Sequence, residues 1–271
     1  MKLITQQTIL ITGSTDGIGK LTALQLAKLG AHVLVHGRNN EKVLVIVDEL
    51  KRLSNNTNIE GLAADFSSLK EVRHLAEEIN SKFSKIDVLI NNAGVGFADN
   101  GKSKDGYELK FAVNYLAPFV FTQLLLPSLK NAAPSRIVNV CSAGQYPINF
   151  DDIMFENNYD SVDAYRQSKL ALIMFTIDLA DQLKDENITV NSLHPGTYLN
   201  TKMVTLAGIN PLGEPEIGAD AEVFLATSEK LDKVTGKYFN VKTEAIVDPQ
   251  AYDKDVRNKL WDLSLRLTNL K

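Results

Sequence analysis

Two side chains four residues apart, Tyr165 and Lys169, form the pair in this sequence that is best suited to proton transfer. Positions four apart lie on one face of a helix, so the phenol and the ammonium can act on the same site. Ser142 stands just after an apolar run that ends at Cys141, where a strand would end. The Tyr and Lys spacing alone also occurs on many helices that have no catalytic role, so other motifs must show whether this pair is catalytic.

A glycine-rich segment follows the first apolar run and leads directly into a helical pattern. Glycines permit a tight turn and let the backbone approach a pyrophosphate, and the first N–H groups of the helix then face the phosphates. A glycine-rich turn alone is weak evidence, but its place between a strand and a helix is the context expected of a dinucleotide site. The predicted phosphate-binding residues are Gly13, Ser14, Thr15, Asp16, Gly17, Ile18 and Gly19.

The end of the second apolar run bears on the choice of cofactor. A carboxylate there would hold the ribose of NAD, but this chain has Gly37 followed by Arg38 and Asn39. A guanidinium is a bidentate partner for a phosphate, so the sequence favours NADP(H) over NAD(H). After the third run come Asp65 and Phe66, and Asp65 could meet the adenine or simply cap the next helix.

Short apolar runs alternate with helical patterns along the whole chain, which predicts a doubly wound α/β fold with a parallel sheet of about seven strands. We expect a single Rossmann-type domain over residues 1–271, with a substrate lid at about 197–215 and a C-terminal helical extension at about 251–268. The predicted strands are 8–12, 32–36, 59–63, 86–91, 136–141, 188–194 and 237–241. The predicted helices are 18–29, 41–53, 69–83, 105–129, 161–183, 216–228 and 251–267.

Composition excludes several other classes of protein. The net charge of −4 gives no basic bias toward nucleic acid. A single cysteine, Cys141, and four scattered histidines predict neither a disulfide framework nor a metal site. No apolar run reaches the roughly 18 residues of a membrane span, and the first residues do not resemble a signal peptide. We therefore expect a soluble, cytoplasmic protein.

The motifs, taken together and in order, resemble those of the short-chain dehydrogenase/reductase family. Within it, segments such as 148–152, 165–170, 190–196 and the tail resemble the retinol dehydrogenase-like branch. Many animal members of that branch carry an N-terminal membrane-anchoring segment that has no counterpart before the first strand here, which argues against a membrane-borne retinoid as substrate. The matching motifs are TGxxxGxG from Thr12 to Gly19, Asp65, NNAG from Asn91 to Gly94, Asn114, Ser142, YxxxK at Tyr165 and Lys169, and Pro195-Gly196.

The resemblance implies a role for each catalytic residue. Tyr165 would be the general acid/base, and one cation about 4 Å away would supply roughly 4 kcal/mol toward its phenolate, enough to bring its pKa near neutrality. Lys169 would be that cation, Ser142 would donate a hydrogen bond to the substrate oxygen, and Asn114 would hold a water that links Lys169 to solvent. The cofactor contacts implied beyond the glycine-rich loop are Asn92, Ala93, Gly94, Tyr165, Lys169, Pro195, Gly196 and Thr197.

Apolar residues around the expected lid predict a lipophilic carbonyl or alcohol as substrate, although several of them could instead pack the lid onto the core. The lid would present Leu199, Val204, Leu206 and Ile209 inward, and Pro147 and Ile148 could line the opposite wall. The predicted substrate contacts are Val95, Phe97, Gly144, Tyr146, Tyr198 and Met203.

The leading hypothesis is an NADP(H)-dependent oxidoreductase that interconverts a carbonyl and an alcohol. The alternatives are reduction of an activated C=C bond and a protein that senses NADP(H) without turnover. An insertion at 149–160 could cover the long helices through which family members pair, so the sequence favours a monomer over a homodimer.

Overall fold

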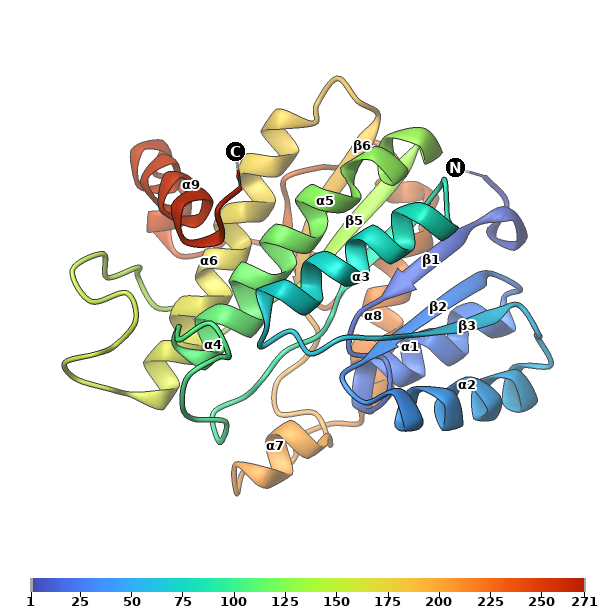
Figure 1. Cartoon of the computed structure of the whole chain (residues 1–271), viewed down its shortest axis with the longest axis horizontal. Coiled ribbons are helices and arrows are strands. Elements are labelled where there is room, and N and C mark those ends of the chain that lie inside the picture. Colours follow the sequence, from blue (N-terminus) through green and yellow to red (C-terminus); the bar gives the residue numbers. More distant parts are fainter. Residues whose placement is uncertain (1, 271) are drawn as a thin grey trace.

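The apolar runs form one mostly parallel sheet at the centre of the molecule (Figure 1). The structure, a computed structural model, describes residues 2–270, and within them eight strands follow the order β3-β2-β1-β4-β5-β6-β7-β8. All neighbours are parallel except β7 and β8. The strands are β1 Thr8–Ile11, β2 His32–Gly37, β3 Ile59–Ala63, β4 Val88–Asn91, β5 Ser135–Val140, β6 Ile188–His194, β7 Tyr238–Asn240 and β8 Thr243–Ala245. The predicted fold class is confirmed, with one more strand than expected.

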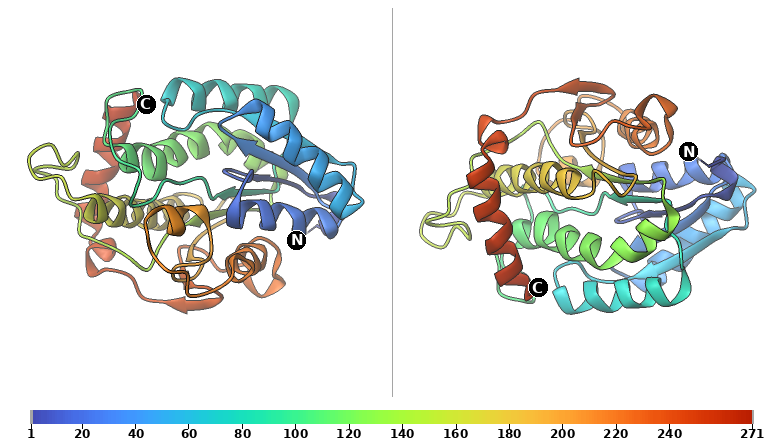
Figure 2. Two further views of the ribbon diagram at one scale, coloured as in Figure 1. Left: turned by 90° about the horizontal axis from the view of Figure 1, so that it is seen from below. Right: turned by 90° about the horizontal axis from the view of Figure 1, so that it is seen from above.

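Helices cover both faces of the sheet (Figures 1 and 2). One face carries α1, α2 and α8, and the other carries α3, α5 and α6. The α-helices are α1 Gly17–Lys28, α2 Asn40–Ser54, α3 Leu69–Lys82, α4 Leu109–Phe111, α5 Ala117–Ala132, α6 Ser161–Gln182, α7 Lys202–Leu206, α8 Pro215–Thr227 and α9 Lys254–Thr268. Short 3₁₀ turns span Ile4–Gln6, Glu229–Leu231 and Pro249–Tyr252.

Side chains that alternate along each strand enter two separate cores. Leu10 packs with the helices α3, α5 and α6, whereas its neighbours Ile9 and Ile11 pack with α1, α2 and α8. Because successive side chains of a strand point to opposite faces, a sheet covered on both faces needs apolar residues at every position. The continuous apolar runs of the sequence therefore reflect a strand order in which β1, β4 and β5 lie in the interior of the sheet.

The predicted helix at 105–129 is interrupted. It begins at Leu109, passes through a π-helical segment at Ala112–Leu116, and continues as α5. The whole stretch Leu109–Ala132 is long and apolar enough to cross a bilayer, but most of it is buried inside the protein, as expected of a core helix. The π-helical segment contains Asn114, and such segments often mark functional sites.

The C-terminal helix α9 packs across α5 and α6 of its own chain (Figure 2, right). The Trp261 ring lies 5.1 Å from that of Phe119 and 5.9 Å from that of Phe175. Arg257 donates to Asp178 of α6 at 2.7 Å, and both side chains are largely buried. This helix covers the long helices, and the first part of the insertion at 149–160 also packs against the start of α6, where the Gln167 side chain bonds to Asn149 and Ile153. The insertion projects as a loop at the start of α6 (Figure 1).

Candidate active site

The motif residues gather at one edge of the sheet, where the parallel strands end. The segments that follow β1, β4, β5 and β6 all reach this edge, which is where open α/β sheets bind their ligands. The N-terminal half of α6 brings Tyr165 and Lys169 to the same place. The lid contains a short helix, α7, which the sequence did not predict, and it lies beyond this edge (Figure 1).

Tyr165 is buried, with 8% of its surface exposed, and its ring meets the Phe97 ring edge-on at 4.5 Å. Burial raises the pKa of Tyr165 to about 12, against the opposing effect of a hydrogen bond with the Ser142 hydroxyl. The predicted lowering toward neutrality is therefore not produced by this chain's own residues. The cost of burying a phenolate exceeds the favourable effect of the hydrogen bond with Ser142.

Lys169 holds its ammonium between the tyrosine and a strand end. Its Nζ donates to the Val140 carbonyl at 2.9 Å and lies 5.7 Å from the centre of the Tyr165 ring. Burial lowers the pKa of Lys169. A Cβ atom on Gly94 would lie 3.5 Å from this Nζ, so a glycine at that position keeps the space beside the ammonium open.

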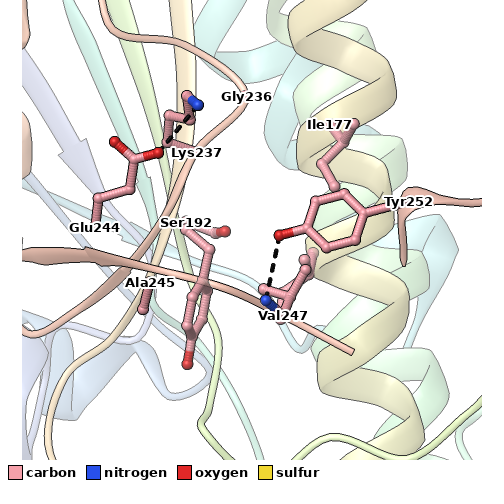
Figure 3. A pocket seen from close by; sticks show the side chains of 10 residues that line it. Ile177, Ser192, Gly236, Lys237, Glu244, Ala245, Val247 and Tyr252 are labelled. Carbon is pink, nitrogen blue, oxygen red and sulfur yellow. Dashed lines mark hydrogen bonds and ion pairs between the residues drawn. The ribbon is translucent and has the colours of Figure 1, made fainter. Parts of the chain in front are cut away.

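Ser142 is positioned from two sides. Its Oγ accepts the Gly144 N–H at 3.0 Å, which leaves the hydroxyl proton free to be donated. Its carbonyl accepts a hydrogen bond from the Tyr238 hydroxyl at 3.0 Å. Tyr238 also lines a cavity of about 80 Å³ between β7, β8 and α6, into which the buried Ser192 points (Figure 3). Tyr238 of β7 thus helps to fix the position of Ser142.

The Asn114 side chain is held by bonds within the protein. The amide oxygen accepts the Val95 N–H at 2.8 Å, and the amide nitrogen donates to the Val95 carbonyl and to Ser168. These bonds fix the side chain in place, and the role of Asn114 in holding a water for Lys169 stays a prediction. Asn114 instead joins α6 to the segment after β4, next to Gly94, where its Oδ1 would lie 3.1 Å from an added Cβ.

The glycine-rich loop has the close packing that a dinucleotide cradle requires. A Cβ on Gly13, whose φ is +65°, would lie 2.7 Å from the Cα of Ala93, and one on Gly19 would lie 2.3 Å from Asn92. Gly17 begins α1 and has a φ of +51°. The backbone of this loop can therefore lie flat against a bound molecule, with the N–H groups of α1 facing it. The residues fit a pyrophosphate.

Two residues outside the predicted set of phosphate-binding residues hold this loop in place. Thr12 is buried, and its Oγ1 accepts the N–H groups of Asn92 and Ala93, both at 3.0 Å. The Asn92 amide donates back to the carbonyls of Thr12 and Gly13. His36 accepts the Gly13 N–H, and burial lowers the pKa of His36 to about 4, which keeps the ring neutral. Thr12 and His36 each end a predicted strand, and this position is the sequence signal that could have identified them.

Three predicted cofactor residues have their side chains engaged inside the protein. The hydroxyl of Ser14 is fully buried and bonds to Ile11 and His36. Phe66 is buried, and its ring lies 4.5 Å from that of His36. The oxygen of Asn39 accepts the Lys42 N–H and caps α2. Only the main chain of Ser14 and Phe66, or the free amide nitrogen of Asn39, remains for a ligand.

Charged groups surround the end of β2. Arg38 is exposed, and a Cβ on Gly37 would lie 2.5 Å from Thr15, so a carboxylate at position 37 would need this loop to move. Asp16 caps α1 and bonds to Lys42 at 3.1 Å and to Lys202 of the lid at 2.7 Å. Burial by itself would raise the pKa of Asp16, but these bonds together lower it to about 2.

Asp65 is not a helix cap. Its carboxylate accepts the Ser67 N–H and pairs with Lys104 at 3.0 Å, whereas Ser68 caps α3 by accepting the Glu71 N–H. Ser68 stands closer to the first helical turn and so satisfies its free N–H groups. The carboxylate of Asp65 stays partly exposed.

The segment after β6 turns sharply at Pro195 and Gly196. Gly196 has a φ of +138°, and a Cβ there would lie 3.0 Å from Leu199. Thr197 shares a hydrogen bond of 3.0 Å with His194, whose pKa burial lowers to about 4. The Thr197 hydroxyl, exposed at the sheet edge, keeps a lone pair available.

The predicted substrate walls are placed in part. Met203 of α7 lies against Gly96, where a Cβ would be 2.5 Å away, so the lid closes onto the segment after β4. Tyr198 and Tyr146 are partly exposed. The prediction fails for Leu206, which is 76% exposed, and for Ile148, which is buried in the core. These two do not line a cleft.

Comparisons with known proteins agree with this geometry. The family model for the short chain dehydrogenase matches residues 7–209. The chain is 36% identical to mouse (Mus musculus) retinol dehydrogenase 13, over 97% of this chain and 84% of that protein. It is 34% identical to human (Homo sapiens) polyprenol dehydrogenase, over 96% and 84%.

Two solved structures are similar along most of the chain. An uncharacterized protein from Mycobacterium paratuberculosis has a TM-score of 0.80 and 29% identity, over 97% of this chain and 94% of that one. The NADP complex of RhlG from Pseudomonas aeruginosa has a TM-score of 0.70 and 27% identity, over 89% and 97%. The chain belongs to the short-chain dehydrogenase/reductase family of oxidoreductases, in its retinol dehydrogenase-like branch.

Proposed function

We propose that this protein is an NADP(H)-dependent enzyme that interconverts a carbonyl and an alcohol on a lipophilic small molecule. The observation that carries the proposal is the convergence of Ser142, Tyr165 and Lys169 beside the open space at Gly94. A protein that only senses the cofactor transfers no proton, so a buried phenol beside a serine hydroxyl and an ammonium favours an enzyme.

The chain's own residues favour the reductive direction. With a pKa raised to about 12, the Tyr165 phenol is protonated at neutral pH and can give its proton to the substrate oxygen. The free hydroxyl proton of Ser142 is donated to the same oxygen as negative charge develops there. The ammonium of Lys169 stabilises the phenolate that results. Bound NADPH would supply the hydride to the carbonyl carbon.

Preference for NADP(H) rests on Arg38 and on the tight space at Gly37. An exposed guanidinium at this position can bind a phosphate in bidentate fashion, and no carboxylate at position 37 repels it. The similarity to RhlG, which was solved with NADP, points in the same direction. The names of the relatives, retinol and polyprenol dehydrogenases, agree with a lipophilic alcohol or carbonyl as substrate.

The first test is a fluorescence titration with NADPH and NADH in parallel. We expect tighter binding of NADPH, and a reversed preference in the Arg38→Asp variant. A panel of aldehydes, ketones and enones then tests turnover with NADPH. Reduction of enones alone would replace the proposal with C=C reduction, and tight cofactor binding with no turnover at all would replace it with a sensor.

We also infer that the protein is a monomer. The faces of α5 and α6 are covered by α9, through Trp261 and the buried pair of Arg257 with Asp178. Sedimentation equilibrium should give a mass near 29.9 kDa, and a mass of twice that value would contradict the inference.

A further inference from the structure

A second pocket lies beside residues 100–102, which follow the predicted substrate contact Phe97 in the chain. It has a volume of about 380 Å³ and opens between the segment after β4 and the insertion before α6. We call it the outer pocket. It is lined by Asn100, Lys102, Glu108, Met154, Phe155 and Tyr159. Met154 and Phe155 supply an apolar wall, and both are half-buried.

The polar end of the outer pocket is built from buried charges. Lys110 is completely buried, and its Nζ donates to the Asp99 carbonyl at 2.5 Å and to the Tyr159 hydroxyl at 2.8 Å. Glu108 is 3% exposed and lies 3.7 Å from the same Nζ. Burying an ion pair is costly unless its geometry is set by other bonds, and here those bonds are present. The floor of the outer pocket is therefore held in a fixed geometry by buried polar groups.

The same group of bonds reaches the catalytic tyrosine. The Asn100 side-chain oxygen accepts from Lys110, from Tyr159 and, at 2.8 Å, from Ser161. The Ser161 hydroxyl also donates to the Phe97 carbonyl, and the Phe97 ring lies against Tyr165. Residues 97–100 therefore contact Tyr165 through Phe97 and line the outer pocket through Asn100.

We propose that the outer pocket is a second subsite of the substrate, which holds the far end of an extended, uncharged lipophilic ketone or alcohol. This inference rests on the proposed function. The charges at the pocket are balanced, because Glu108 pairs with Lys110 and Lys102 pairs with Glu156. A charged end would meet no net opposite charge, whereas an apolar chain meets Met154 and Phe155.

The position of the pocket sets a minimum length for such a substrate. Ser161 precedes Tyr165 by four residues of α6, which corresponds to about 6 Å along the helix axis. A substrate with its reacting oxygen at Tyr165 must extend at least that far to reach the pocket. Short ketones would react without touching it. Longer ketones would gain from each methylene that enters, by about fourfold in kcat/KM.

The test is a homologous series of methyl ketones, from butanone to decanone, reduced with NADPH. We expect kcat/KM for decanone to exceed that for butanone by about tenfold or more in the natural chain. Met154→Trp fills the pocket and should reduce this ratio to near one. Ile246→Trp adds the same bulk at a side chain that is 87% exposed and should keep the ratio. An equal ratio in Met154→Trp and the natural chain would overturn the proposal.

A second variant tests the proposal in the case that Met154→Trp does not fold. Phe155 has a φ of +50°, a conformation that a glycine adopts without strain, so Phe155→Gly should fold while removing part of the wall. It should also lose the preference for long ketones, and full retention of that preference would count against the subsite.

Failure of the proposed function would appear separately, as no reduction of any ketone. Calorimetric titration with decanol in the presence of NADP⁺ then tests the pocket without turnover. Binding that is at least tenfold weaker in Met154→Trp supports the subsite, and unchanged binding overturns it.

Discussion

The two ends of the same sheet edge are held together in different ways. At the cofactor end, buried side chains join one strand end to the next, as Thr12 does with Asn92 and His36 with Gly13. At the substrate end, the lid is tied down by an exposed pair, Lys202 with Asp16, and by contact of Met203 with Gly96.

Because of this difference, substrate specificity can change at the lid without loss of the fold. Buried hydrogen bonds are expensive to break because the freed groups cannot reach water, whereas an exposed pair exchanges readily with solvent. A family can therefore keep one cofactor site and vary its substrate by altering the lid and the insertion. Substitutions at the two ends should therefore differ in their cost to catalysis and to stability.

Tyr165→Phe removes one hydroxyl at the point where the two ends meet. We expect kcat to fall by about 10²–10⁴-fold, the usual contribution of a general acid, while the Kd for NADPH stays within twofold or so of the natural chain. Steady-state kinetics and a fluorescence titration measure the two quantities. Near-normal turnover would remove Tyr165 from the mechanism.

Glu222→Gln tests how a buried carboxyl near the cofactor end affects the stability of the fold. Glu222 is fully buried on α8, one of its oxygens accepts the Thr22 hydroxyl, and the other has no hydrogen-bond partner. Burial raises the pKa of Glu222 from 4.5 to about 8, against the opposing effects of Thr22 and the charge of Lys169. The unfolded chain thus ionises at lower pH than the folded protein, so the folded state loses stability as pH rises from about 4.5 to 8.

Urea unfolding at pH 5 and pH 9 measures this effect. The natural chain should lose on the order of 3 kcal/mol more than Glu222→Gln over that interval, since each pKa unit corresponds to about 1.4 kcal/mol. Glu216→Gln, on the exposed side of α8, serves as the control and should follow the natural chain. Parallel pH profiles for Glu222→Gln and the natural chain would show that Glu222 does not titrate in this range.

Thr12→Val breaks the buried bonds of the cofactor end while it conserves volume. Two N–H groups, of Asn92 and Ala93, would lose their acceptor. We expect a loss of about 2 kcal/mol of unfolding free energy and weaker NADPH binding. Thr8→Val, at the opposite end of β1, is the matched control and should leave NADPH binding unchanged. Unchanged NADPH affinity in Thr12→Val would refute the claim that these bonds shape the cradle.

Lys202→Ala opens the exposed pair at the substrate end. The side chain of Lys202 is 72% exposed, so its removal should change the unfolding free energy by less than about 0.5 kcal/mol. The KM for a ketone should change more than stability does, because the lid loses its bond to Asp16. A loss of stability as large as that of Thr12→Val would abolish the distinction between the two ends.

The sequence predicted the sheet, and the meeting of the motif residues at one of its edges, from the pattern of strands. Strands buried on both faces need continuous apolar runs, and motifs at the strand ends fall on one edge whatever the details of packing. The short elements β8 and α7 escaped prediction because three to five polar or mixed residues carry no periodic signal.

The side-chain partners within the site were less predictable. The amide of Asn114 bonds to Val95 and Ser168, and the side chains of Ser14 and Phe66 turn inward. Each of these contacts joins segments far apart in the chain. Their geometry depends on the distance between elements, which no local pattern contains.

The sequence by itself determined the family, the parallel sheet and the edge at which Tyr165, Lys169 and the glycine-rich loop meet, because these follow from residue type and order along the chain. Only the tertiary structure decided how those groups are charged and what surrounds them. Burial of Tyr165 and Glu222 raises their pKa values, and the buried pair of Lys110 with Glu108 forms the base of the outer pocket. Such effects depend on the exclusion of water from around a group, and water is excluded only after distant segments have packed together.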